Sequence, residues 1–362
     1  MKGKVLVAGF STRHVAQSAA CAGYEVCAID HFCDQDLSWY TTDREKFDEL
    51  ADLPEAIDRL CRRHRFDLFV ATSGAEDLCV SLPSCGTPKN TIGRFLDKLD
   101  TQHFFEDIGV PVPGLVSCGK YPVMVKPRQG AGGWRNAVVR DDAGLAAWET
   151  LYPGIPYICQ EVAGGLPASV CCITDGVRAR AIAANEQLLK GDGEPGFGFC
   201  GSITPLDHPL RDDMVAMAER VAAASGCTGT IGIDFILGTT TPFAIEVNPR
   251  FQGTVDTVER AYGCNLFQYH VDACRGKLPP GSVPPRQVAV RSILFADRDL
   301  TLTSDLKHLA PFVSDIPWPG TFFEEGQALI SVFGWGPTRD AAVSLLDKHI
   351  STVRQYIRSW IP

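Results

Sequence analysis

The segment AIEVNPRF, residues 244–251, combines apolar side chains with two polar ones that could bind a cation. Glu246 and Asn248 are two positions apart, and side chains two apart project from the same face of a β-strand. If the segment forms a strand, a carboxylate and an amide oxygen therefore point in the same direction.

A second carboxylate lies in the preceding predicted strand, TIGIDFIL. A five-residue turn, Gly238–Pro242, would set Leu237 opposite Phe243. The same register sets Asp234 opposite Glu246. Two carboxylates roughly 5 Å apart repel by about 3 kcal/mol at an effective dielectric constant of 20, so either one is protonated or a cation lies between them. Because all the ligand atoms are oxygens, Mg²⁺ or Mn²⁺ is favoured over zinc.

Magnesium in proteins is usually held by one or two carboxylates together with substrate phosphates, so a phosphate-binding segment is expected elsewhere. The Walker pattern G-x-x-x-x-G-K-[ST] is absent. Instead, the predicted strand VMVKP carries Lys126 near its end, and RQGAGGWR follows it. Gly130, Gly132 and Gly133 would let backbone amides approach a phosphate. An ordinary flexible turn is the alternative interpretation.

The composition excludes several classes of protein. The chain has 362 residues, which favours two or three lobes, and its net charge of −9 argues against nucleic acid as a partner. We expect no membrane span and no signal peptide, and hence a cytoplasmic protein. The 14 cysteines form no C-x-x-C pair and lie mostly in apolar runs. We therefore expect reduced structural thiols rather than disulfides.

Residues 1–90 alternate between strand and helix patterns, which predicts a parallel sheet with ligands at the carboxyl ends of its strands. The predicted elements are KVLVAG, HVAQSAACAG, YEVCAID, a charged helix at 53–65 and FDLFVATSG. Arg13 and Glu76 follow such strand ends and are candidate substrate residues, although polar residues at helix ends are the equal alternative. A nicotinamide-binding fold is disfavoured because G-x-G-x-x-G is absent and Gly9 stands alone.

The remainder of the chain predicts a mixture of strands and helices. A helix at 91–107 precedes the strands YPVMVKP, RNAVVRD, PYICQEV and SVCCITDG, and a helix at 212–225 precedes the carboxylate hairpin. A proline-rich linker at 279–285 leads to the strands VAVRSILFA and ALISVFGWG and to a helix at 339–359.

The order of these motifs resembles the ATP-grasp superfamily across roughly residues 90–275. Lys98 precedes GVPVPG, Lys126 precedes the glycine-rich loop, and QEVAGG, GIDF and IEVNPRFQG follow in that order. The chain looks similar to archaeal ATP-grasp ligases and predicted ATP-dependent carboligases related to biotin carboxylase, some of them linked to C1-cofactor biosynthesis.

The resemblance implies an α/β and α+β protein with an ATP-grasp fold. It implies a Rossmann-like pre-ATP-grasp domain at 1–90 and an ATP-grasp domain at 91–278, with ATP between two subdomains. A small C-terminal α+β part would occupy 286–362. A homodimer is compatible with this resemblance.

The resemblance also assigns roles to residues. Contacts to ATP are implied for Lys98, Lys126, Gly130, Gly132, Gly133 and Lys190 and for the adenine hinge Gln160, Glu161 and Val162. Magnesium ligation is implied for Asp234, Glu246 and Asn248, and contact with the transferred phosphate for Arg250. Substrate contacts are implied for Asn185 and Gln187. Pro167 lies where the family often has an acid that binds ribose, so ribose recognition departs from the pattern.

The implied activity is an ATP-dependent ligase, with ATP and Mg²⁺ as cofactors and a small acid and an amine as substrates. The acid would be activated as an acyl phosphate and attacked by the amine. One alternative is a carboxylase that forms carboxyphosphate from bicarbonate. Another is an ATP-binding subunit without turnover, which three retained metal ligands argue against.

Overall fold

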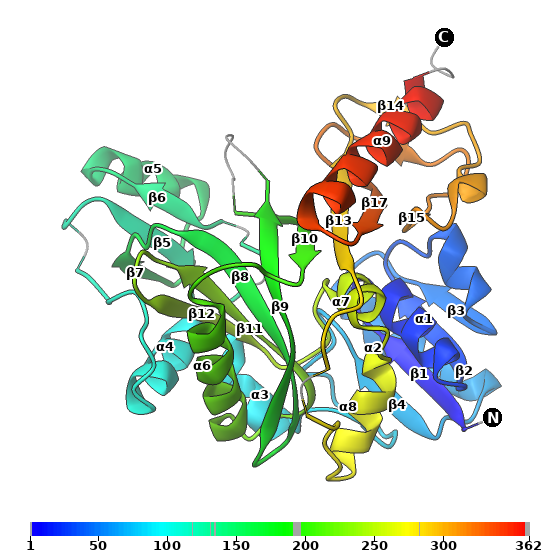
Figure 1. Ribbon diagram of the computed structural model, residues 1–362, viewed down its shortest axis with the longest axis horizontal. Helices are drawn as coiled ribbons and strands as arrows, with labels where there is room; N and C mark the ends of the chain where they lie inside the picture. Colours follow the sequence, from blue (N-terminus) through cyan, green and yellow to red (C-terminus); the bar gives the residue numbers. More distant parts are fainter. Residues whose placement is uncertain are drawn as a thin grey trace.

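The computed structural model describes residues 2–117, 119–130, 132–133, 135–190, 197–281 and 283–358. An amino-terminal α/β part, a small antiparallel sheet and a large antiparallel sheet follow one another along the chain (Figure 1). A parallel sheet with helices and separate antiparallel sheets make up the mixed α/β and α+β class that the sequence predicts.

The amino-terminal part is a four-stranded parallel sheet in the order β3-β2-β1-β4. Its elements are β1 (Lys4–Ala8), α1 (Arg13–Cys21), β2 (Glu25–Asp30), η1 (Gln35–Trp39), β3 (Asp43–Lys46), η2 (Leu50–Asp52), α2 (Leu53–Arg63) and β4 (Leu68–Ala71). The parallel sheet is confirmed, but its edge strand β3 was not predicted. Its sequence, DREK, has no apolar alternation, because its carboxylates pair with Arg59 and Arg63 on α2.

The single helix predicted at 91–107 is wrong, because two helices occupy this region. They are α3 (Lys89–Leu96) and α4 (Lys98–Asp107). Asp97 has extended backbone angles between them, and its carboxylate accepts a hydrogen bond from the backbone N–H of Leu99 at 2.8 Å. An aspartate that caps a helix in this way starts a new helix rather than continuing the previous one.

The small sheet has the antiparallel order β6-β5-β7 and carries one helix. Its elements are β5 (Val123–Pro127), β6 (Ala137–Val139), α5 (Asp142–Leu151) and β7 (Tyr157–Glu161). Its apolar core, which includes Val123, Val125 and Trp148, is separate from the core of the large sheet.

The large sheet has eight strands in the order β12-β11-β8-β9-β10-β13-β17-β15. Its first five strands and one helix are β8 (Leu166–Asp175), β9 (Ala179–Leu189), β10 (Phe199–Thr204), α6 (Arg211–Ala224), β11 (Thr228–Leu237) and β12 (Pro242–Asn248). Two further helices, α7 (Val255–Tyr262) and α8 (Leu266–Cys274), pack in one apolar cluster with β1, β2 and α1 of the amino-terminal part.

Three strands of the carboxyl-terminal part extend the same sheet, and two others form a separate two-stranded sheet. The elements of this part are β13 (Val288–Phe295), β14 (Leu300–Thr301), η3 (Lys307–Leu309), β15 (Val313–Ser314), β16 (Phe322–Phe323), β17 (Ala328–Gly336) and α9 (Arg339–Arg358). Strand β13 pairs with β10, so the large sheet continues past the proline-rich segment. Helix α9 packs over β17 and β13 (Figure 1).

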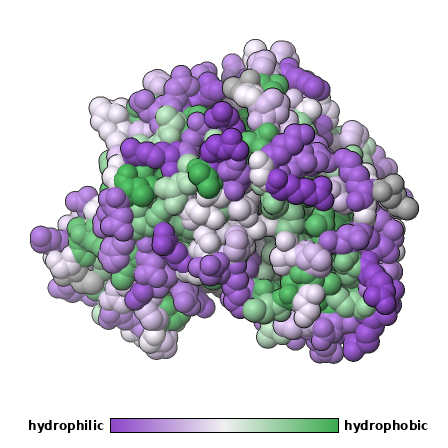
Figure 2. Space-filling view, turned by 90° about the horizontal axis from the view of Figure 1, so that it is seen from below, coloured by the Kyte–Doolittle hydropathy of each residue, from purple (hydrophilic) through white to green (hydrophobic). Residues whose placement is uncertain are grey.

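Within the described residues, no helix is both long and apolar enough to cross a membrane. The face of the molecule drawn in Figure 2 is mostly hydrophilic, with hydrophobic side chains in separate patches. All the cysteines among the described residues are free thiols.

Candidate functional site

The two carboxylates that the sequence placed together face each other on adjacent strands. Asp234 on β11 pairs directly with Glu246 on β12. The predicted partner of Leu237 is wrong, however, because Leu237 pairs with Pro242 across a shorter turn. A register shift between Asp234 and Phe235 adds one residue to β12 and restores the pairing of the two acids. Such a β-bulge bends a strand and redirects its side chains.

The Asp234 carboxylate is surrounded by side-chain amides. Its Oδ1 accepts hydrogen bonds from Gln187 at 2.9 Å and Gln252 at 3.1 Å, and its Oδ2 accepts one from Asn248 at 3.0 Å. Burial, followed by the charge of Glu246, raises the pKa of Asp234 to about 7. A cation between the two acids would remove this repulsion.

Glu246 and Lys126 are the least satisfied charges of the site. Neither side chain has a hydrogen bond or ion pair to any residue that the structure describes. Lys126 is only 7% exposed, and burial lowers its pKa to about 8, an effect that Glu246 opposes and Lys98 reinforces. A buried ammonium group without a partner is costly, so this lysine is placed to meet an anion.

Arg250 connects the metal ligands to the amino-terminal part. Its Nη2 donates to Asn248 Oδ1 at 3.0 Å, and its Nε forms an ion pair with Glu76, which follows β4. Glu76 also accepts from the backbone N–H of Gly74. The structure thus brings Glu76 to the site, beside the arginine proposed to contact phosphate.

Gln252 is a site residue that the sequence reasoning missed. Asn248, Arg250 and Gln252 are polar residues spaced two apart, and this pattern in the sequence could have predicted Gln252 as a site residue. A Cβ atom on Gly232 would lie 1.8 Å from Gln252 Cδ, so the glycine of GIDF is what allows this glutamine to reach Asp234.

The phosphate-side residues lie around the end of β5. Lys98 Nζ donates to the carbonyl oxygen of Gly130 at 2.6 Å. Gly130, Gly132 and Gly133 have positive φ angles of 127°, 68° and 72°, which favour glycine. Ala131 and Trp134 of the same predicted loop lie outside the described residues.

The predicted adenine hinge follows β7. Gln160 is 4% exposed and donates to Gln102 Oε1 at 2.6 Å, whereas its own Oε1 is buried without a partner in the described chain. Glu161 and Val162 are exposed, and the backbone N–H of Glu161 donates to Gly114 O at 2.8 Å. Pro167 pairs with Ile236 inside the large sheet, so it offers no polar group for ribose.

Two other candidates have partners of their own. Asn185 is fully buried, where it donates to Ser169 and accepts from Thr204. Lys190 lies 4.6 Å from the centre of the Phe295 ring, on β13. We therefore assign Asn185 a structural role and do not retain Lys190 as a phosphate contact.

Arg13 belongs to a separate group of charges, here named the junction cluster: Arg13, Asp36, Asp256, Arg291 and Asp315. Arg13 is 2% exposed and donates two hydrogen bonds to Asp256, at 2.8 and 2.6 Å, and one to Asp315 at 2.8 Å. Arg291 pairs with Asp315 at 2.9 Å. These contacts join the amino-terminal part, α7 and the carboxyl-terminal part, so we assign Arg13 to the junction rather than to substrate.

A second polar group of metal-ligand type lies away from the facing acids. Cys85, His270 and Cys274 bring their ligand atoms within 4.8 Å of one another. Both ring nitrogens of His270 are already engaged with the backbone: Nδ1 accepts from Thr230 N–H at 2.9 Å and Nε2 donates to Cys85 O at 3.0 Å. These contacts favour a structural role.

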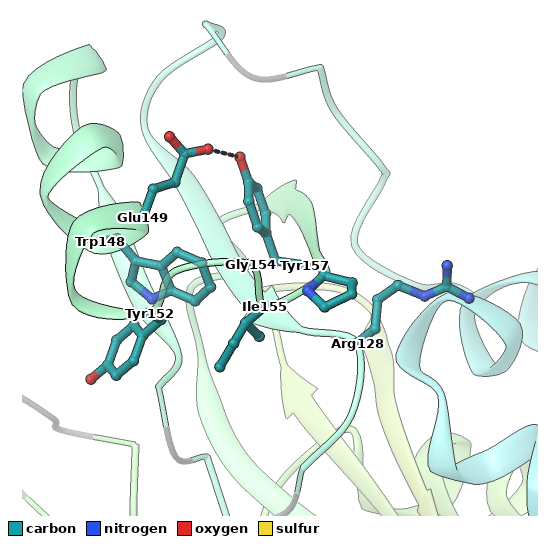
Figure 3. A pocket seen from close by; sticks show the side chains of 8 residues that line it. Arg128, Trp148, Glu149, Tyr152, Gly154, Ile155 and Tyr157 are labelled. Carbon is teal, nitrogen blue, oxygen red and sulfur yellow. Dashed lines mark hydrogen bonds between the residues drawn. The ribbon is translucent and has the colours of Figure 1, made fainter.

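A cavity of about 480 Å³ lies on the small sheet, beside α5 (Figure 3). It is lined by Arg128, Trp148, Glu149, Tyr152, Gly154, Ile155, Pro156 and Tyr157. The Tyr157 hydroxyl donates to Glu149 at 2.6 Å, whereas Arg128 points away from the rings and pairs with Asp97. The cavity contains none of the predicted metal ligands.

The residues around Asp234 fit a magnesium–nucleotide complex. The donor set consists of two carboxylates and one amide, which suits Mg²⁺. The unpartnered ammonium of Lys126 suits a phosphate, and the unpartnered Gln160 Oε1 suits a hydrogen-bond donor such as an amino group.

Comparison with known proteins identifies an ATP-grasp domain at residues 95–254. An uncharacterized protein of Methanocaldococcus jannaschii is 24% identical over 358 residues, which cover 91% of this chain and 87% of that protein. The arginine-specific large chain of carbamoyl phosphate synthase from Geobacillus stearothermophilus is 25% identical over 54% of this chain. That match covers only 20% of the synthase chain.

Solved structures share the fold. The biotin carboxylase domain of Hydrogenobacter thermophilus 2-oxoglutarate carboxylase, solved with MgADP, ADP and bicarbonate, has a TM-score of 0.79 and 15% identity, covering 96% of this chain and 89% of that one. The L-amino acid ligase of Bacillus licheniformis has a TM-score of 0.71 and 15% identity, covering 96% and 97%. Residues 95–254 therefore match an ATP-grasp domain, and the chain shares its fold with a biotin carboxylase domain and an L-amino acid ligase.

Proposed function

We propose that the protein is an ATP-dependent ligase that activates a carboxylic acid as an acyl phosphate for attack by an amine. The products would be a C–N bond, ADP and phosphate. The observation that carries this proposal is the convergence of the facing acids Asp234 and Glu246 with the unpartnered Lys126.

The residues have distinct roles in this proposal. Asp234, Glu246 and Asn248 would hold Mg²⁺, which when bound neutralises phosphate charge. Lys126 and Lys98 would bind the phosphates of ATP and offset the charge that develops on the transferred group. Arg250 would exchange its contact with Glu76 for one with the acyl phosphate. No nucleophilic side chain is needed, because positioning and charge stabilisation suffice for phosphoryl transfer.

The experiment is a phosphate-release screen with Mg-ATP, in which candidate acids and amines are tested singly and in pairs. With the right acid and no amine, hydroxylamine should trap the acyl phosphate as a hydroxamate. The nucleotide product should be ADP. Formation of AMP and pyrophosphate would refute the proposal, because the proposal assigns the lysines and acids to the terminal phosphates.

Carboxylation through carboxyphosphate is the second candidate, and the fold shared with a biotin carboxylase domain favours it. ATP hydrolysis measured with bicarbonate and no organic acid distinguishes the carboxylase from the carboxylate–amine ligase. If bicarbonate alone stimulates ATP hydrolysis, the protein is a carboxylase; if only an organic acid does so, it is a carboxylate–amine ligase. A third candidate, an ATP-binding subunit without turnover, requires that ATP binds but no acid or bicarbonate stimulates hydrolysis.

We also propose a homodimer as the assembly, because the biotin carboxylase domain of similar fold was solved as a dimer. Light scattering of the purified chain tests this, and a monomeric mass across the accessible concentrations would refute it.

A further inference from the structure

An exposed aromatic cluster lies at the carboxyl ends of β1 and β2, outside the residues assigned above. Phe10 and Phe32 are 41% and 40% exposed. Phe10 stacks on His31 with ring centroids 4.6 Å apart and an interplanar angle of 11°. Phe32 stands edge-on to both rings, at 5.3 and 4.9 Å. Single exposed apolar residues are common, but a contiguous exposed group indicates a binding surface.

The backbone holds these rings in place. The buried Asp30 carboxylate accepts hydrogen bonds from the Thr12 hydroxyl and from the backbone N–H groups of Phe32 and Cys33, each at 2.8 Å. Cys33 has a φ angle of 51°, which is rare for a residue with a side chain, and its carbonyl accepts from Trp318 at 2.9 Å. The exposed rings therefore lie on a rigid loop, as preorganised ligand contacts do.

The cluster is connected to the phosphate side of the site. The backbone N–H of Phe10 donates to Ser73 O at 2.7 Å. Ser73 lies three residues before Glu76 in the chain, and Glu76 pairs with Arg250. The short segment 73–76 thus links the backbone beside the aromatic rings to the arginine beside the predicted metal ligands.

One polar atom of the cluster has no partner. The Nδ1 atom of His31 is buried, and no residue that the structure describes forms a hydrogen bond with it. Phe47, which is 3% exposed, packs edge-on against the same ring at 5.8 Å. The cluster therefore offers a planar apolar surface with one unused hydrogen-bonding position.

We propose that Phe10, His31 and Phe32 bind the planar ring of the acid substrate while its carboxylate lies beside Arg250. The substrate class is an aromatic or heteroaromatic carboxylic acid, with a hydroxyl or N–H group that meets His31 Nδ1. This inference rests on the proposed function, because it places the ring of the acid that ATP would activate.

The test compares two acids of the same size, phenylacetate and cyclohexylacetate, which differ in planarity. Their binding to the protein saturated with Mg²⁺ and a non-hydrolysable ATP analogue is measured by ligand-observed NMR titration. We expect phenylacetate to bind about tenfold more tightly, since stacking adds to area burial. Phe10→Ala should remove this preference. Phe322→Ala, which removes a phenylalanine on β16 that is 56% exposed, is the control and should retain it.

A second variant tests the polar position. We expect 4-hydroxyphenylacetate to bind more tightly than phenylacetate to the wild-type protein, and His31→Phe to abolish this gain while keeping the stacking preference. Nucleotide affinity and the circular dichroism spectrum are measured for each variant. Values unchanged from the wild-type protein exclude misfolding.

Three results would overturn the inference. One is equal binding of the planar and non-planar acids, and another is an unchanged preference in Phe10→Ala. The third is no binding of either ring-bearing acid at millimolar concentration. Loss of self-association in Phe10→Ala with ligand affinity unchanged would instead make the cluster a contact between copies. Because binding is measured without turnover, these failures are distinct from failure of the ligase proposal, which appears as an absent hydroxamate with every acid.

Discussion

The junction cluster and the candidate site, two groups of charged side chains among the described residues, differ in whether their charges are paired. In the junction cluster, Arg13 and Arg291 are both ion-paired with Asp315, and Arg13 also contacts Asp256 and Asp36. At the candidate site, Lys126 and Glu246 have no ion-pair partner among the described residues. Both groups are largely buried, so desolvation alone does not distinguish them.

The comparison separates a structural cluster from a binding site by charge pairing. Buried charges that pair with one another hold elements together. Removing one partner leaves the other as an uncompensated buried charge, which destabilises the fold. Buried charges that lack partners are costly in the free protein and become favourable when a ligand supplies the opposite charge. The following predictions test this difference, from the largest expected effect to the smallest.

Arg13→Ala should lower the free energy of unfolding by about 3–5 kcal/mol, because it leaves Asp256 and Asp315 buried with fewer partners. Urea denaturation measures this loss. Arg59→Ala, which breaks partly exposed pairs with Glu45 and Glu55, is the control and should cost about 1 kcal/mol or less. A loss below that of the control would mean that the junction cluster does not hold the three parts together.

Glu246→Gln should lower ATP turnover by about 10²–10³-fold with almost no change in the free energy of unfolding, because it removes a charge but preserves shape. Steady-state ATP hydrolysis and urea denaturation on the same preparation measure the two effects. Glu55→Gln, at an exposed position on α2, is the matched control. Near-normal turnover in the folded Glu246→Gln protein would exclude the metal assignment.

Lys126→Met should weaken ATP binding by about tenfold or more, since hydrogen bonds to charged groups contribute about 1.5–3 kcal/mol. Adenosine binding should change little, because adenosine has no phosphate. Calorimetric titration with both ligands measures the difference. Equal losses for ATP and adenosine would show that Lys126 does not contact phosphate.

His14, buried beside the junction cluster, should make stability depend on pH. Burial lowers its pKa to about 4, from an ordinary value of 6.5. Between these values the unfolded chain binds a proton that the folded chain does not, so stability falls as pH drops below 6.5 and levels off near pH 4. The expected loss at pH 5 is about 2 kcal/mol.

Comparison of wild-type protein with His14→Gln isolates this effect. Asp36 acts with the opposite sign, because its pKa is raised to about 6 by burial, so the wild-type profile alone is not sufficient. Urea denaturation at pH 7.5 and pH 5 should show a smaller change in the variant. An identical change in both proteins would contradict the assignment to His14.

Short-range patterns allowed much of the site to be predicted. Alternation along a strand places Glu246 and Asn248 on one face, and the repulsion between facing carboxylates indicates a cation without reference to the rest of the fold. The register near the turn could not be predicted, because the bulge beside Asp234 depends on how β12 packs against its neighbours. The facing of Asp234 and Glu246 was right although the Leu237 pairing was wrong.

What the sequence determined by itself is therefore many of the strands and helices and the residue types of the predicted metal ligands, since these follow from periodicity and residue type. The tertiary structure decided how residues distant in the sequence are used. Arg13 and Arg250 look alike in sequence, but one is buried against Asp256 and the other reaches Glu76 and Asn248. Local patterns do not encode this difference. It depends on how segments hundreds of residues apart pack together, which places Arg13 in the junction cluster and Arg250 at the candidate site.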